Sequence, residues 1–103
     1  ASEIFLFDAS AVSTGAPIRA RMFAPALGVG EDPATGSAGA CLAAYLAKYA
    51  NAAATPSWTV EQGFEMGRPS ILSLSADRYG GDMGAIRVAG KSVLVSEGVI
   101  RAG

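Results

Sequence analysis

The stretch Glu31-Asp-Pro-Ala-Thr-Gly-Ser-Ala-Gly-Ala-Cys-Leu-Ala-Ala-Tyr-Leu-Ala-Lys-Tyr49 is the one long segment of this chain with the pattern of a helix. From Ala38 to Ala47 it carries no charged residue on any face, and most of its side chains are small. A helix that is apolar all round is normally buried all round. We therefore predict a central helix that begins between Pro33 and Ala38, ends near Tyr49 and is enclosed by a sheet.

The residues at the start of this predicted helix have the chemistry of an anion site. Backbone N–H groups at a helix start lack partners within the helix, and the macrodipole adds partial positive charge there. Gly36 has no Cβ to keep a ligand away, and Ser37 and Thr35 add hydroxyl groups, which together would suit a carboxylate or phosphate. A plain capping role is the alternative, because Asp32 before Pro33 is a common start to a helix. The chemistry of these residues alone leaves both interpretations open.

Composition sets limits on the class of protein. The chain has 103 residues, half of them hydrophobic and 17% charged, which predicts one folded domain spanning residues 1–103. With 8 basic and 9 acidic residues there is no basic patch, which argues against nucleic acid as a partner. No apolar run approaches the roughly 20 residues that cross a bilayer, and no signal-peptide pattern opens the chain, so we expect a cytoplasmic protein without membrane contact.

The cysteine and histidine counts exclude several kinds of site. The chain holds one cysteine and no histidine, so it cannot form an internal disulfide or a Ser-His-Asp triad by itself. A zinc site is not expected either, and we predict that no metal is bound. Cys41 lies inside the apolar helix, where we expect it to be a small packed residue.

Six further segments have the composition of β-strands. The segment 18–23 alternates apolar and polar side chains, as a half-exposed strand does. Ala85–Ala89 and Ser92–Ser96 flank Gly90-Lys91 and predict a hairpin. The expected strands are residues 3–8, 18–23, 57–62, 70–76, 85–89 and 92–96. The expected connections are residues 9–17, 25–29, 51–56, 66–69 and 79–84. The prediction is an α+β domain with about six strands curled as a barrel around one buried helix.

Several motifs together resemble the phenazine biosynthesis-like (PhzF-like) family. They are Arg21-Met-Phe-Ala-Pro25, Glu31-Asp-Pro-Ala-Thr-Gly-Ser-Ala38, the helix residues Leu42, Tyr45 and Leu46, Glu61-Gln-Gly63 and Met66-Gly-Arg-Pro-Ser70. They follow the order expected for the family and span essentially the whole chain. The resemblance implies a diaminopimelate-epimerase-like fold, in which two lobes each wrap a small barrel around a helix and the active site lies between them. This chain is similar to the carboxyl-terminal lobe.

The resemblance also implies a function. Family members related to phenazine biosynthesis act as isomerases by proton transfer without a cofactor, on a small metabolite that bears a carboxylate. A glutamate on the amino-terminal lobe shuttles the proton. By resemblance, Asp32 is the catalytic residue of this lobe and binds substrate together with Thr35, Gly36 and Ser37. The expected partners are the amino-terminal lobe, in the same protein or on a separate chain, and a second copy in a homo-oligomer.

Two weaker candidates and one other function stay open at this point. Gln62 and Arg21 are the weaker candidates for substrate contact, and a solvated arginine on a strand face is the alternative interpretation for Arg21. A non-catalytic carboxylate-binding or assembly module that keeps the fold is the alternative function. The residues do not decide whether Asp32 orients the substrate or carries a proton, nor which substrate is bound.

Overall fold

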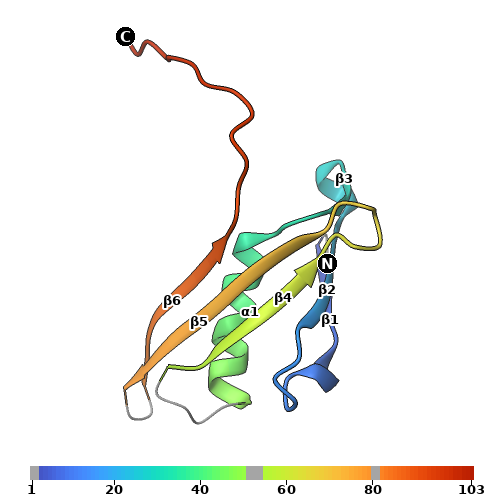
Figure 1. Cartoon of the computed structure of the whole chain (residues 1–103), viewed down its shortest axis with the longest axis vertical. Helices are drawn as coiled ribbons and strands as arrows, with labels where there is room; N and C mark the ends of the chain where they lie inside the picture. The colour runs from blue at the N-terminus through green and yellow to red at the C-terminus, as the bar shows by residue number, and fades with distance from the viewer. Residues whose placement is uncertain (1–2, 51–54, 80–81) are drawn as a thin grey trace.

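The computed structural model describes residues 3–50, 55–79 and 82–103, which form a mixed sheet, one α-helix and an extended carboxyl-terminal segment (Figure 1). The strands are β1 (Ile4–Phe7), β2 (Ile18–Ala24), β3 (Val29–Asp32), β4 (Ser57–Gln62), β5 (Ser70–Tyr79) and β6 (Asp82–Gly90). The helix α1 spans Gly36–Tyr49, and short 3₁₀ turns cover Ala9–Ala11 and Pro25–Leu27. The helix begins and ends where the sequence predicts.

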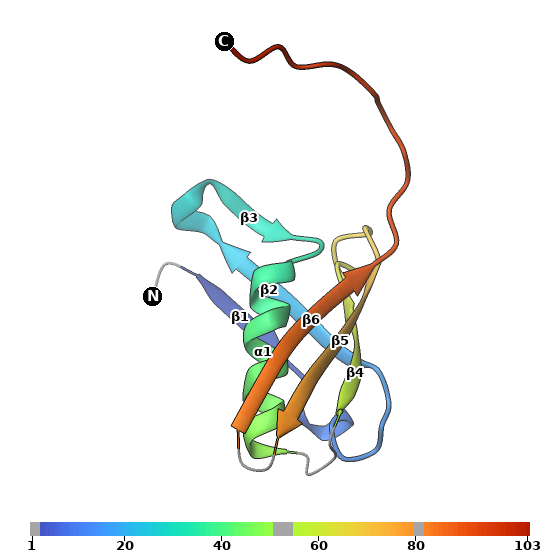
Figure 2. The same cartoon turned by 90° about the vertical axis from the view of Figure 1, so that its left-hand side faces the viewer.

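The sheet has the strand order β1-β2-β4-β5-β6, and β3 pairs with β2 outside this path. All pairs are antiparallel except β2 and β4, which run parallel with Ile18 opposite Val60. Parallel neighbours require a long crossover connection, and here that connection contains α1. The sheet curls into a half-barrel, and α1 lies against its concave face (Figure 2). The α+β character predicted from the sequence is therefore correct.

The core lies between α1 and the inner face of the sheet. In β2 the side chains of Ile18 and Ala20 are buried while Arg19 is exposed, as the alternating pattern predicts. The buried cluster comprises Ala11, Ile18, Ala20, Leu42, Ala43, Leu46, Val60, Leu72 and Leu74. At Gly39 an added Cβ would lie 3.2 Å from the side chain of Leu74, so this glycine lets the helix approach β5 closely.

The prediction that α1 is buried on every side is wrong. Leu42, Ala43, Leu46 and their neighbours face the sheet, but the opposite face holds Cys41 and Tyr45, both exposed to solvent. Tyr45 is 53% exposed. Small residues permit close packing on a face without requiring it, and a thiol and a phenol both tolerate water. The sheet is therefore a half-barrel in this structure and not a closed barrel, and Cys41 is not the packed residue that we expected.

One predicted strand is wrong, and another was missed. Residues 92–96 form no strand but belong to an extended, exposed segment, and β6 pairs with β5 instead. Val29–Asp32, expected to be part of a loop, forms β3 because it finds the free edge of β2. Part of the connections expected at 51–56 and 79–84 lies outside the described residues. In the described part of the chain, no helix is long and apolar enough to span a membrane.

Candidate functional site

Three elements bring the predicted site residues together at one end of the sheet. β3 ends at Asp32, α1 begins at Gly36, and β4 ends at Gln62 (Figures 1 and 2). The connection between β3 and α1 is short and contains Pro33, which cannot continue the ladder of β3 because it lacks an N–H group. This geometry holds Asp32 close to the first turn of the helix.

Thr35 links Asp32 to the helix. It is the N-cap residue in an extended conformation, but its side chain does not cap the helix. Its hydroxyl instead donates a hydrogen bond to Oδ2 of Asp32. The capping interpretation, with Asp32 followed by Pro33 at the helix start, is therefore wrong. The hydrogen bond fixes the half-buried carboxylate of Asp32 beside the helix start.

Gly36 and Ser37 leave the first turn of α1 open to solvent. Both residues are exposed, and a Cβ added at Gly36 would meet no atom within 4 Å. The first N–H groups of a helix have no acceptor within it, and this helix has no side-chain cap from Thr35. An anion could therefore approach these N–H groups from solvent next to Asp32.

Gln62 lies beneath this corner and is completely buried. Its Nε2 donates hydrogen bonds to the carbonyl oxygen of Asp32 at 2.8 Å and to Oγ1 of Thr35 at 2.9 Å. Its Oε1 accepts a hydrogen bond from the backbone N–H of Thr35 at 3.3 Å. The structure thus brings the weaker candidate Gln62 into contact with the main site residues, although its side chain is shielded from solvent.

Arg21, the other weaker candidate, is engaged elsewhere. Its guanidinium group donates two hydrogen bonds to the carboxylate of Glu31, at 3.0 and 2.9 Å, and lies 5.0 Å from the centre of the Phe23 ring. The hydrogen bonds from Arg21 hold the pKa of Glu31 below its usual value, and those bonds raise the pKa of Arg21 in turn. The pair ties β2 to β3 one residue before Asp32.

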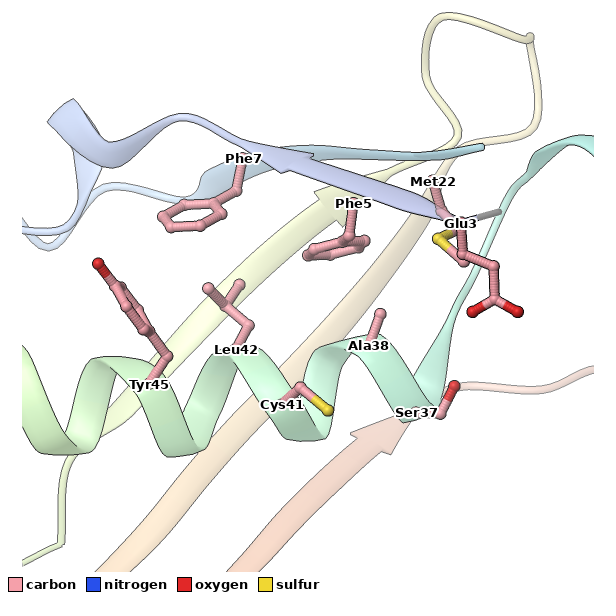
Figure 3. Close-up of a pocket in the computed structure, with 9 residues that line it drawn as sticks. All are labelled: Glu3, Phe5, Phe7, Met22, Ser37, Ala38, Cys41, Leu42 and Tyr45. Atoms are coloured by element: carbon pink, nitrogen blue, oxygen red, sulfur yellow. The ribbon is translucent and has the colours of Figure 1, made fainter. Parts of the chain in front are cut away.

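A groove between β1 and the exposed face of α1 was not predicted from the sequence. It has a volume of about 660 Å³ and is mostly apolar (Figure 3). Its lining residues are Glu3, Phe5, Phe7, Met22, Ser37, Ala38, Cys41, Leu42 and Tyr45. Figure 3 shows Glu3 and Ser37 at one end and Phe7 and Tyr45 at the other. We expected the helix to be buried on every side, so the sequence did not predict this groove. The groove exists because one face of α1 is uncovered.

The described residues offer no grouping of three or more acidic, cysteine or histidine side chains that could hold a metal ion. The chemistry at the corner is instead that of hydrogen bonding. The carboxylate of Asp32 is half-buried and accepts a hydrogen bond from the buried Thr35 hydroxyl, and the first N–H groups of α1 belong to the exposed residues Gly36 and Ser37. Such a set can bind a carboxylate and orient a hydroxyl or amine beside it.

The chain belongs to the family described as phenazine biosynthesis-like protein, which matches residues 2–98. It is 41% identical over 80 residues to the trans-2,3-dihydro-3-hydroxyanthranilate isomerase of Pseudomonas aeruginosa, covering 78% of this chain and 29% of that protein. The isomerase of that name from Pseudomonas chlororaphis is 39% identical over 82 residues, covering 80% and 30%. An uncharacterised isomerase of Mesorhizobium japonicum is 34% identical over 95 residues, covering 91% and 32%.

These relatives agree with the resemblance recognised in the sequence motifs. These relatives are named as isomerases, which supports the predicted class of enzyme. The chain spans only about 30% of the length of these relatives.

Proposed function

We propose that this chain is the carboxyl-terminal lobe of a two-lobe isomerase with a diaminopimelate-epimerase-like fold. The enzyme would act by proton transfer, without a cofactor, on a small metabolite that bears a carboxylate. The relatives from Pseudomonas are named for a ring acid with a hydroxyl group, and a compound of that kind is the substrate class we propose here. The active site would lie between this lobe and an amino-terminal lobe.

The observation that supports this proposal is the open helix start beside a held carboxylate. The N–H groups of Gly36 and Ser37 would bind the substrate carboxylate, because they are exposed and the N-cap side chain does not occupy them. Asp32 would contact the hydroxyl or amine of the substrate or carry a proton. Thr35 would keep Asp32 in place through its hydrogen bond to Oδ2.

The proton-transfer step needs more than this lobe provides. Removing a proton next to a carboxylate requires a base at close range and donors directed at the charge that develops. The helix start is a set of donors, and Asp32 is the carboxylate that lies beside it. A second group on the opposite side of the substrate would come from the amino-terminal lobe, which is the partner that we propose.

Complementation tests the proposal. The chain would be mixed with the amino-terminal portion of the Pseudomonas aeruginosa relative, and isomerisation of trans-2,3-dihydro-3-hydroxyanthranilate would be measured by chromatography. We expect the mixture to be active and the chain alone to be inactive. Asp32→Ala should lower the rate of the mixture by about 10²–10⁴, the usual contribution of a positioned acid or base.

Asp82→Ala is the matched control, since Asp82 is exposed and is the first residue of β6, which begins at the end of the sheet opposite the start of α1 (Figure 1). It should leave the rate unchanged. Activity of the chain alone would contradict the two-lobe model, and full activity of the Asp32→Ala mixture would remove Asp32 from the mechanism. A mixture that binds the substrate without converting it would favour the alternative, a non-catalytic carboxylate-binding module.

A further inference from the structure

We propose that Gln62 is a positioning residue that sets the conformation of the loop carrying Asp32 and Thr35. It acts from a neighbouring part of the sheet, through hydrogen bonds to both residues, and is not a substrate ligand. The inference rests on the function proposed above, because that function gives Asp32 and the helix start their role. Gln62 is completely buried, so its side chain does not contact a ligand that approaches from solvent.

The chemistry of its partners fixes the orientation of the Gln62 amide. The carbonyl oxygen of Asp32 can only accept a hydrogen bond, and the backbone N–H of Thr35 can only donate one. Nε2 must therefore face Asp32, at 2.8 Å, and Oε1 must face Thr35, at 3.3 Å. In this orientation the amide has a second N–H group, which points to Oγ1 of Thr35 at 2.9 Å.

That second N–H group decides where the Thr35 hydroxyl points. A hydroxyl has a single hydrogen, and Oγ1 of Thr35 already accepts from Gln62, so its own hydrogen is free to go to Oδ2 of Asp32. The result is a directed chain of donors from Gln62 through Thr35 to Asp32. A residue without an N–H donor at position 62 would leave the hydroxyl free to turn away from Asp32.

The sheet makes Gln62 a rigid support for this chain of hydrogen bonds. Gln62 lies between Ala20 of β2 and Ser70 of β5, so its backbone is held on both sides. The next residue, Gly63, fits so closely that an added Cβ would lie 2.1 Å from the carbonyl oxygen of Arg68 and 2.9 Å from that of Pro33. The loop from Asp32 to Thr35 therefore rests on the end of β4 through backbone as well as side chain.

Two measurements on the 103-residue chain test the inference. Benzoate serves as the probe for a ring carboxylate, and its affinity is read from the amide shifts of Gly36 and Ser37. Hydrogen exchange of the Thr35 amide, relative to the core amide of Leu74, reports the loop without any ligand. In Gln62→Met we expect benzoate to bind about tenfold more weakly and the Thr35 amide to exchange about tenfold faster, as loss of buried hydrogen bonds predicts.

Val60→Ala is the matched control, because Val60 is also completely buried and lies two residues earlier on the same strand. It should lower stability while leaving the benzoate affinity and the relative exchange of Thr35 unchanged. Thr35→Ser keeps the hydroxyl and should bind benzoate like the unmodified chain, whereas Thr35→Val should bind it more weakly. In a chain that already carries Thr35→Val, Gln62→Met should weaken benzoate binding by less than it does in the unmodified chain. Part of the effect of Gln62→Met is transmitted through the Thr35 hydroxyl, which Thr35→Val removes.

The outcomes separate this inference from the proposed function. If benzoate fails to shift the amides of Gly36 and Ser37 in the unmodified chain, the proposed site is wrong, and the exchange of Thr35 still decides the role of Gln62. If Gln62→Met changes neither measurement more than Val60→Ala does, Gln62 is an ordinary core residue. Equal effects of Gln62→Met with and without Thr35→Val would overturn the chain of donors.

Discussion

At the scale of single residues, Gly63 is the described glycine at which a side chain is least tolerated. Its φ angle is +82°, a left-handed conformation that side chains disfavour, and the space for a Cβ is already filled by the carbonyl oxygen of Arg68. Gly67 has a similar φ angle of +73°, but a Cβ added there would meet nothing within 4 Å. Comparing variants at these two glycines therefore separates the free-energy cost of the left-handed backbone conformation from the cost of a steric clash.

Gly67→Ala should therefore lower the free energy of unfolding by about 1–2 kcal/mol, the usual cost of the left-handed conformation. Gly63→Ala should cost clearly more, about 3 kcal/mol or greater, because β4 must also move away from Arg68 and Pro33. Urea denaturation of the two variants measures the difference. Equal losses in both would mean that the collision at Gly63 relaxes without cost.

The predictability of the site also differs from residue to residue. Asp32, Thr35, Gly36 and Ser37 are close in the sequence, so one motif predicted all four, and the fold brings them together. Gln62 was predicted only as a weaker candidate for substrate contact, because it contacts Thr35 from 27 residues away along the chain and no local pattern indicates that contact. The orientation of the Thr35 hydroxyl towards Asp32 depends on that long-range contact, so local capping rules predicted a different bond.

At the scale of elements, α1 has one buried face and one exposed face. Its composition predicted the helix and its ends, because those depend on local sequence. Its burial depends on how many strands surround it, which the helix itself does not encode. The same limit explains β3, whose Gly30, Glu31 and Asp32 resemble a loop. β3 forms because β2 has a free edge and because Arg21 binds Glu31 across the pair.

The one-sided burial of α1 gives different expectations for neighbouring alanines. Ala43 is completely buried, so Ala43→Leu should overpack the core and lower the free energy of unfolding by about 1–3 kcal/mol. Ala44 is half-buried, and Ala44→Leu should cost less than about 1 kcal/mol. Thermal melting compares the two variants. A closed barrel around the helix would instead make both variants similarly unstable.

The pairing of β2 with β3 should depend on pH. Hydrogen bonds from Arg21 lower the pKa of Glu31 below 4.5, so the bound carboxylate stabilises the fold above that pH and loses this effect as the pH falls. Glu31→Gln should therefore lower the melting temperature at pH 7, and the difference from the unmodified chain should shrink as the pH is lowered from 7 towards 3. Glu97→Gln, at an exposed position outside the sheet, is the control and should match the unmodified chain at pH 7. A constant difference across this range would exclude the ion pair as its cause.

At the scale of the whole molecule, a large apolar surface lies outside the core. The extended segment 91–103 projects away from the sheet (Figures 1 and 2), and Val93 and Val95 are 85% and 90% exposed. The groove between β1 and α1 adds a second open apolar surface (Figure 3). Exposed apolar side chains gathered in this way are typical of an interaction site, and the amino-terminal lobe that we propose is a partner that would cover them.

The extended segment should therefore promote association of the isolated chain. Replacing Val93 and Val95 together with Asp should reduce concentration-dependent association in sedimentation velocity experiments without lowering the melting temperature. Replacing Ser92 and Ser96 together with Asp adds the same charge at polar positions and should have a smaller effect. If both pairs act alike, charge rather than apolar contact controls association.

The parallel pairing of β2 with β4 has a consequence for the order of folding. β1–β2–β3 and β4–β5–β6 are each built from antiparallel neighbours that are close in the sequence, whereas the β2–β4 pair joins distant segments across α1. Closing a long loop has a larger entropic cost than closing a hairpin, so the β2–β4 pair should form after the local ones. Asp32 and Thr35 lie at and just after the end of β1–β2–β3, whereas Gln62, which bonds to both, lies in β4–β5–β6. The hydrogen bonds from Gln62 that orient the site therefore form late. A folding intermediate in which β1–β2–β3 and β4–β5–β6 have formed but have not yet paired would have its strands but not the ordered binding site.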